Sequence, residues 1–429
     1  MVSAKPMRTL INRVRSVYQD DTIGAFLTLM LLFGVAVGIF TGVLNNYLYE
    51  ILAIDRVGRG IVEFPRELPG LLLFVLVGLM HHFTEKRMLR TAFVVSTGGL
   101  LLLVLFGTAR IPSILFIVLW STGEHLLMPV RQSISIHAAR PGKEGLAMGT
   151  TASVANIGQV VGHYSIPVLF LVLRSLGVFG ADAPAAAAVE PGGGVFGPFQ
   201  VAFLLAAILM VAGIVLSFRV AATQRPVRRP RIFIRKRYWK YYVLEAFYGA
   251  RKQVFLTFAP YVLIIVYGAR TELIATLYGI WSLATIFVGP LFGKLLDKVG
   301  YRVILIVDAT LLMLLCVVYG FAHRILPMDV AFVVVSVVFV LDAVLFVVGM
   351  ARAMYARTLS ESQEEVTAAL STGISVNHLI SIVIAIVGGV LWESLGMETL
   401  FTVAALFGAG SALFSFTLPR ARARTRKPA

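Results

Sequence analysis

Charged side chains occur in the middle of long apolar stretches of this sequence. Glu124 and His125 share one stretch, Arg251 and Lys252 share a second, and Asp342 lies in a third. An ionised side chain in hydrocarbon costs at least about 2.5 kcal/mol on insertion scales, so each of them should face protein or a water-filled cavity. These five residues are therefore the first candidates for binding protons or a charged solute.

The two adjacent cations favour an anionic ligand. A guanidinium group forms paired hydrogen bonds with carboxylates and phosphates, so we expect Arg251 or Lys252 to attract an anionic solute. Tyr248 and Asn46 are expected as further contacts to that solute. In an alternative interpretation Glu245 pairs with Lys252, seven residues away on nearly the same helix face, and Arg251 is the charge that remains.

The acidic residues are candidates for proton coupling. Glu124, assisted by His125, is the first candidate proton carrier, and Asp342 is the second. A carboxyl group in a dry interior holds its proton more strongly than in water unless a cation is near, so it can bind and release a proton as its surroundings change. The alternative is fixed ion pairing with Arg131 or Arg251, which would hold helices together without moving protons.

The elements that must position these residues are membrane-spanning helices. The chain has 429 residues, of which 58% are hydrophobic and only 14% are charged, whereas soluble domains carry roughly 25% charged residues. Apolar runs long enough to cross a bilayer recur along the whole chain, which excludes a soluble enzyme and a single membrane anchor. The runs predict twelve transmembrane helices at 23–47, 64–83, 91–108, 111–136, 145–173, 197–219, 240–267, 271–292, 303–322, 328–352, 366–392 and 396–418.

The basic residues set the expected orientation. The formal net charge is +16, but the cations gather in alternate loops between apolar runs instead of forming one face, which argues against nucleic acid as a partner. The excess of Lys and Arg in these loops places both termini in the cytoplasm, and the expected location is a bacterial inner membrane. The basic stretch from Arg219 to Lys240 is expected to lie on anionic lipid headgroups.

The two halves of the sequence resemble each other. Gly34 and Gly249 are 215 positions apart, as are Gly78 and Gly293, and Asn156 and Asn377 are 221 apart after one shift of register. Such a repeat is typical of transporters built from two related bundles. We therefore predict a six-helix bundle at 1–218, a basic cytoplasmic linker at 219–239, and a second six-helix bundle with a basic tail at 240–429.

One predicted cytoplasmic loop carries a recognisable motif. It reads Gly293-Lys-Leu-Leu-Asp297-Lys298-Val-Gly300-Tyr-Arg302, in which glycines permit a tight turn and the cations stay inside. This loop resembles the cytoplasmic motif of the major facilitator superfamily, and the resemblance extends over about residues 20–418. The copy in the first half departs from the pattern, because His82 replaces the acidic residue and the second glycine is missing.

The resemblance implies an all-α fold of two pseudo-symmetric six-helix bundles that transport a small solute by rocking about a central cavity. It also implies that the ninth helix is peripheral, so Asp308 is interpreted as a structural partner of Arg302 near the inner surface. Gly293, Asp297, Lys298, Gly300 and Arg302 are the expected gate residues.

The predicted function is secondary active transport of a small anionic organic solute, coupled to protons, by a single chain. The alternatives are an exporter of amphipathic or drug-like compounds, and a flippase for lipids or lysolipids. A nucleotide-binding loop of the Walker type is absent from the sequence, and spaced Cys and His ligands are absent too, so neither a cofactor nor a metal is expected.

Overall fold

The fold is that of an all-α protein. The computed structural model describes residues 17–19, 23–80, 82–141, 143–178, 197–220, 234–345, 348–361 and 363–420. Across these ranges the chain is helical apart from short connections and isolated β-bridges, one of which joins Tyr18 and Ala139. A bilayer offers no partners to peptide groups, so helices that satisfy their own backbone are the expected solution for so apolar a chain. The predicted fold class is confirmed.

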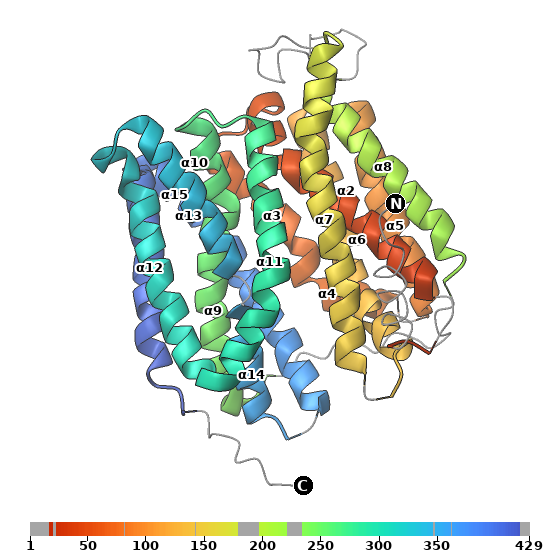
Figure 1. Cartoon of the computed structure of the whole chain (residues 1–429), viewed down its shortest axis with the longest axis vertical. Coiled ribbons are helices and arrows are strands. Elements are labelled where there is room, and N and C mark those ends of the chain that lie inside the picture. The colour runs from red at the N-terminus through yellow and green to blue at the C-terminus, as the bar shows by residue number, and fades with distance from the viewer. Residues whose placement is uncertain are drawn as a thin grey trace, which may run out of the picture. The chain divides into compact units, whose positions relative to one another are not determined.

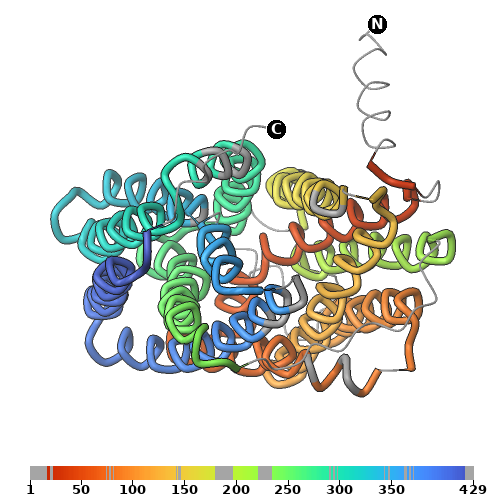
Figure 2. Tube along the Cα trace, turned by 90° about the horizontal axis from the view of Figure 1, so that it is seen from below, coloured from red at the N-terminus to blue at the C-terminus, as the bar shows by residue number. Residues whose placement is uncertain are grey.

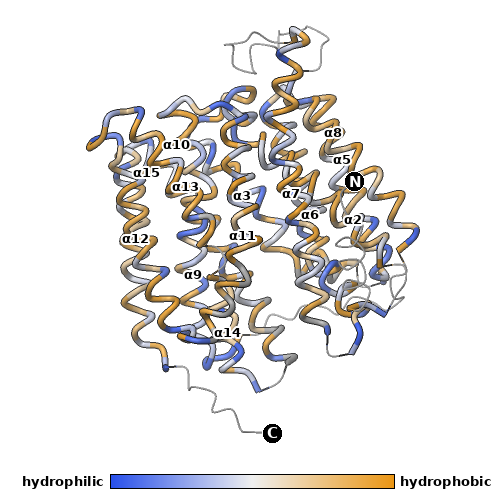
Figure 3. Tube along the Cα trace, viewed as in Figure 1, coloured by the Kyte–Doolittle hydropathy of each residue, from blue (hydrophilic) through white to orange (hydrophobic). Residues whose placement is uncertain are grey.

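The long helices have the length and composition of membrane spans. Figure 3 shows apolar residues along most of their length, with hydrophilic residues concentrated at their ends and at a few positions inside. Many large apolar side chains are exposed, among them Leu79, Ile111 and Leu176, as expected where lipid replaces water. The described residues include eight candidate spans, Ile23–Ile51, Glu85–Phe106, Arg110–His137, Leu146–Ser175, Pro198–Ser217, Thr271–Val288, Tyr301–Ile325 and Thr372–Ser415.

Other helical stretches bear on the predicted count of twelve. The last span lies within α15 (Gln363–Ser415), whose backbone is not helical at Gly396, where φ is 86°. Three further stretches each consist of two α-helices in succession, namely α3 with α4 (Arg56–Leu71 and Leu73–Leu79), α9 with α10 (Trp239–Gln253 and Ala259–Ile265), and α13 with α14 (Met328–Leu345 and Gly349–Leu359). The count of twelve transmembrane helices stays a prediction.

The chain forms two compact units. Unit 1 comprises residues 1–54, 65–229 and 269–283, and unit 2 comprises residues 55–64, 230–268 and 284–429. Two helices are divided between the units, since α3 begins in unit 2 and ends in unit 1, while α11 (Thr271–Val299) begins in unit 1 and ends in unit 2. The predicted division into bundles at 1–218 and 240–429 stays a prediction.

Unit 1 is built around α2 (Ile23–Asn46). This helix packs against α7 (Glu144–Ser175) and α8 (Pro198–Ser217), and α5 (Glu85–Phe106) packs against α6 (Arg110–His137) and α8 (Figure 1). Aromatic rings fill the centre: the rings of Phe40 and Trp120 are 4.8 Å apart, and those of Tyr47 and Phe203 are 5.0 Å apart. At Gly34 the backbone of α2 touches the backbone of α7 near Ala155, an approach that a side chain would prevent.

Unit 2 repeats this close contact between its own helices. α9 packs against α15, and α12 (Tyr301–Ile325) packs against both α13 and α15, so that α12 and the end of α15 lie side by side (Figure 2). A Cβ added at Gly249 of α9 would lie 2.6 Å from the carbonyl oxygen of Asn377 in α15. Gly34 and Gly249 are paired by the sequence repeat, so each unit uses the matching glycine for a close helix contact.

Candidate functional site

A single arginine in unit 2 is shared by two aspartates. Arg251 of α9 is buried, and its Nη1 donates to both carboxylate oxygens of Asp308 at 3.2 and 3.1 Å. Its Nη2 donates to Asp342 Oδ1 at 3.1 Å. The two aspartates come from α12 and α13, so this guanidinium joins three helices. Both carboxylates are buried, as expected for charges that are neutralised by an ion pair inside an apolar interior.

The pairing of Asp308 corrects one expectation. The predicted partner Arg302 lies at the start of α12, where its Nη2 donates to the carbonyl oxygen of Phe416 at 2.7 Å. Asp308 lies nearly two turns further along and is only 8% exposed, on the face of α12 that meets Arg251. The interpretation of Asp308 as a partner of Arg302 was wrong, because adjacent turns of one helix need not face the same neighbour.

A second ion pair lies beside the first. Arg352 of α14 donates from Nε to Glu245 Oε1 at 2.9 Å, and its guanidinium carbon lies 3.5 Å from the ring centroid of Tyr248. Glu245 is thus paired with Arg352, whereas the alternative interpretation paired it with Lys252, which is half-buried. Glu245, Tyr248 and Arg251 are spaced by three residues on α9, which places them on successive turns.

The cluster carries an excess of negative charge. We call it the unit 2 charge cluster, and it contains two cations and three carboxylates, a formal sum of 2 − 3 = −1, from Arg251, Arg352, Glu245, Asp308 and Asp342. A cavity of about 20 Å³ reaches Tyr248, Arg251, Asp308 and Arg352. One water molecule needs about 10–15 Å³ of such space, so the cavity admits water but not an organic solute.

The backbone next to Arg251 departs from regular α-helix. A π-helical turn, η4 (Val254–Phe258), separates α9 from α10, and the side chain of Gln253, the last residue of α9, donates to Thr257 Oγ1 at 2.5 Å. Turns of this type are frequent at functional sites, since they redirect side chains within a helix. The regular apolar pattern of the sequence gives no sign of this turn.

The other predicted proton carriers lie in unit 1. His125 is buried in α6, with Nδ1 2.8 Å from the carbonyl oxygen of Ser121, whose hydroxyl donates to the carbonyl oxygen of Arg66 at 2.6 Å. Glu124 is half-buried and interacts electrostatically with Arg131 of the same helix. Glu124 and His125 therefore belong to unit 1, while Asp342 belongs to unit 2.

The remaining predicted site residues are dispersed. Asn46 is buried in unit 1, where its Nδ2 donates to Glu50 at 2.8 Å and to the carbonyl oxygen of Ala269 at 3.2 Å. In the gate motif, the side-chain surroundings of Gly293 and Asp297 lie outside the described residues. Gly300 has φ of +81° just before α12, a backbone conformation that favours glycine, and Lys298 is exposed.

Sequence and structure comparisons identify the family. Residues 67–373 match the family model of the Major Facilitator Superfamily. The chain belongs to this superfamily. A search among curated proteins finds no match to it.

Solved structures of superfamily transporters share the fold. A POT family transporter in complex with a thioalcohol-conjugated peptide is 13% identical, with a TM-score of 0.70 over 94% of this chain and 97% of that one. A D-xylose-proton symporter is 15% identical, with a TM-score of 0.67 over 94% and 98%. The nucleoside transporter NupG is 11% identical, with a TM-score of 0.66 over 93% and 100%. At these identities the likeness establishes the fold alone.

The sequence did not identify two buried residues of this superfamily member as parts of a site. Asp308 was expected to pair with Arg302 and not with Arg251, although its position inside an apolar run indicated a buried charge. Glu63 of α3 is fully buried in unit 2, where it pairs with Arg59 and accepts from Gln253 Nε2 at 3.1 Å. The sequence around Glu63 is rich in charges and lies at the edge of a predicted span, so it gave no signal.

Proposed function

We propose that this superfamily member is a proton-coupled secondary transporter of a small organic solute, in which Arg251, Asp308 and Asp342 form the coupling site. The observation that carries the proposal is the sharing of one buried guanidinium by two carboxylates. Three carboxylates against two cations leave the unit 2 charge cluster one negative charge in excess, which a single bound proton neutralises.

The chemistry follows from the cost of unpaired charge in an apolar interior. Asp342 and Asp308 compete for Arg251, so a proton on either one makes that carboxyl neutral and leaves the other aspartate ionised beside Arg251. Loss of the proton restores the shared arrangement. Because the aspartates belong to α12 and α13 while the arginine belongs to α9, binding and release of the proton changes which helices are held together. That change is what coupling to transport requires.

The same change of ion-pair partner explains why the solute should be an anion. In the shared arrangement Arg251 is held by two carboxylates, and the adjoining cavity of about 20 Å³ has no room for an organic molecule. Once Asp342 is protonated, one arm of the guanidinium is released and can attract an anion. We propose that proton and anionic solute bind together for this reason, with Lys252 and Tyr248 as the further contacts. The contact expected at Asn46, which lies in unit 1, stays a prediction.

A solved structure of the same fold supports the combination of a solute with protons. One neighbour is a D-xylose-proton symporter, so a protein of this fold combines a small solute with protons. For the present chain, proton coupling rests on the charge cluster. The expected arrangement is a single functional chain in a bacterial inner membrane with both termini in the cytoplasm, as the distribution of Lys and Arg indicates.

The test uses purified protein in liposomes. Uptake of a panel of small organic acids driven by an inward proton gradient is compared with solute exchange in the absence of a gradient. Asp342→Asn should abolish accumulation of the solute without reducing exchange. Asp308→Asn should also reduce accumulation. Asp329→Asn, which removes an exposed carboxylate at the start of the same helix α13, is the matched control and should behave as wild type. Undiminished proton-driven accumulation by both Asp342→Asn and Asp308→Asn would contradict the proposal.

A further inference from the structure

A second, larger cavity lies in unit 2 and shares no lining residue with the first. It has a volume of about 320 Å³ and is formed by the first turns of α12 together with the residues that follow α15. Its wall contains two arginines, Arg302 and Arg420, and the apolar side chains of Val303, Ile306 and Phe416. The cavity thus combines two positive charges with an apolar wall.

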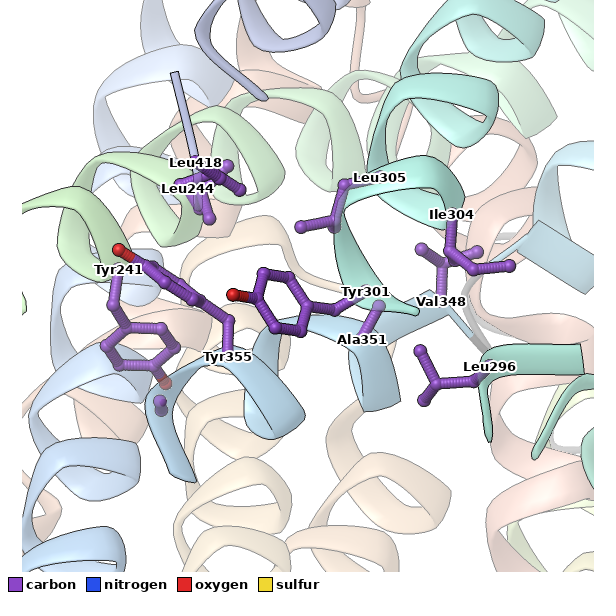
Figure 4. Packing of buried hydrophobic residues seen from close by; sticks show 11 residues of the cluster. Tyr241, Leu244, Leu296, Tyr301, Ile304, Leu305, Val348, Ala351, Tyr355 and Leu418 are labelled. Carbon is purple, nitrogen blue, oxygen red and sulfur yellow. The ribbon is translucent and has the colours of Figure 1, made fainter. Parts of the chain in front are cut away.

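Two hydrogen bonds and a buried hydrophobic cluster join the walls of this cavity. The hydroxyl of Tyr301 donates to the carbonyl oxygen of Pro419 at 2.9 Å, and Arg302 Nη2 donates to the carbonyl oxygen of Phe416 at 2.7 Å. Figure 4 shows Tyr301 and Leu418 among the buried residues of one hydrophobic cluster. The start of α12 and the segment after α15 are therefore fixed to each other, and the two arginines belong to a formed site.

The position of the cavity is at the boundary between apolar and polar surroundings. The candidate span Tyr301–Ile325 begins, and the candidate span Thr372–Ser415 ends, next to cavity residues. Val303 and Phe416 line the cavity and are 48% and 54% exposed, so the apolar wall continues onto the outer surface. The N-terminus of α12 adds the positive end of a helix dipole at the same place.

We propose that this cavity binds the headgroup of an anionic phospholipid. Arg302 and Arg420 contact the phosphate, since a guanidinium retains further N–H donors after its bond to Phe416. The acyl chains follow Val303, Ile306 and the exposed ring of Phe416. A soluble anion would use the arginines but not this exposed apolar wall, which is why the occupant is assigned as a lipid. The inference does not depend on the proposed proton coupling.

The experiment measures lipid binding to delipidated, purified protein by native mass spectrometry. The probes are phosphatidylglycerol and phosphatidylcholine with identical acyl chains. The Arg302→Gln, Arg420→Gln double variant should bind phosphatidylglycerol about 25-fold more weakly, because each basic residue near an anionic surface contributes a factor of about five. Arg87→Gln with Arg219→Gln removes the same charge from exposed positions of unit 1, and this control should bind as wild type does.

A further variant separates charge from shape. Val303→Trp fills the cavity without changing the charge of the protein, and it should also weaken phosphatidylglycerol binding. Size-exclusion profiles and circular dichroism establish that each variant is folded. The proposal is overturned by equal binding of both lipids, by equal losses in the cavity variant and the Arg87, Arg219 control, or by displacement of phosphatidylglycerol with millimolar inorganic phosphate, which would identify a site for a soluble anion.

Discussion

Arg251 Nη2 lies 3.1 Å from Asp342 Oδ1, while Nη1 of the same guanidinium holds both oxygens of Asp308. A buried arginine paired with one carboxylate would form a neutral ion pair that does not favour binding of a proton. Two carboxylates beside one arginine carry an excess negative charge, and a proton that binds to either carboxylate neutralises it. Charges inside a membrane must be paired, and here the pairing itself creates a group that can bind a proton, which a transporter can use.

The stability of unit 2 should depend on the balance of charge around Arg251. Arg251→Met leaves two buried carboxylates without their shared cation, so we expect a loss of about 3–5 kcal/mol in the free energy of unfolding. Thermal or denaturant unfolding of purified protein measures it. Lys252→Met changes the neighbouring, half-buried cation and should have a much smaller effect.

A neutral variant distinguishes charge balance from loss of packing. The triple variant Arg251→Met, Asp308→Asn, Asp342→Asn carries no charge at the three positions and should recover most of the lost stability, while proton-driven accumulation stays absent. If the triple variant is as unstable as Arg251→Met alone, the carboxylates are not the source of the instability.

Glu124 provides a separate test of where the proton binds. Glu124→Gln should retain proton-driven accumulation, because Glu124 lies in unit 1 with Arg131 as its electrostatic neighbour and is not part of the unit 2 charge cluster. Uptake and exchange in liposomes are measured side by side with Asp342→Asn. Loss of accumulation in Glu124→Gln, with exchange intact, would move the coupling role to Glu124.

Much of the fold could be predicted from the sequence, and the charge cluster only in part. Apolar periodicity and the cost of buried charge were sufficient to predict an all-α membrane protein and to single out Arg251 and Asp342. The repeat paired Gly34 with Gly249, and in each unit the matching glycine makes a close helix contact. The partner of Asp308 could not be predicted, because it depends on which faces of α9, α12 and α13 meet in three dimensions.

The division of α3 and α11 between units was also beyond the sequence. Their hydrophobic patterns show that these segments are helices, but not that the first residues of α3 join the contacts of unit 2 through Glu63 and Gln253. Contacts of this kind join parts of the chain far apart in sequence, and the pattern within one segment carries no information about them.

Acid should weaken a contact at the start of α15. The backbone N–H of Glu361 donates to Glu365, and Arg237 and Arg235 lie against the same carboxylate, which together lower the pKa of Glu365 below its ordinary value of 4.5. A carboxylate with a lowered pKa stabilises the folded state above its ordinary pKa, and this contribution is lost as the pH falls through the lowered value.

Glu365→Gln should therefore melt at a lower temperature than wild type at pH 7, and the difference should shrink as the pH falls below about 4.5. Melting of the purified protein across this range measures the effect. Arg235→Gln with Arg237→Gln removes the cations and should reduce the same pH dependence. A difference between Glu365→Gln and wild type that stays constant from pH 7 to pH 4 would show that the carboxylate charge is not involved.

The close contact at Gly249 should make even the smallest added side chain harmful. In Gly249→Ala the new Cβ would lie 2.6 Å from the carbonyl oxygen of Asn377, so α9 and α15 must move apart. Gly149 of α7 has no atom within 4 Å of an added Cβ, and Gly149→Ala should be neutral or stabilising, since alanine favours a helix by about 1 kcal/mol over glycine. Gly249→Ala should therefore lower the melting temperature, whereas Gly149→Ala should leave it unchanged or raise it. Gly34→Ala in unit 1 should lower the melting temperature to a similar extent, because the repeat gives the two glycines the same role. At Gly34 an added Cβ would meet the backbone of Ala155. If Gly249→Ala were as stable as Gly149→Ala, these helices would not be in backbone contact and the structural basis of the repeat would lie elsewhere.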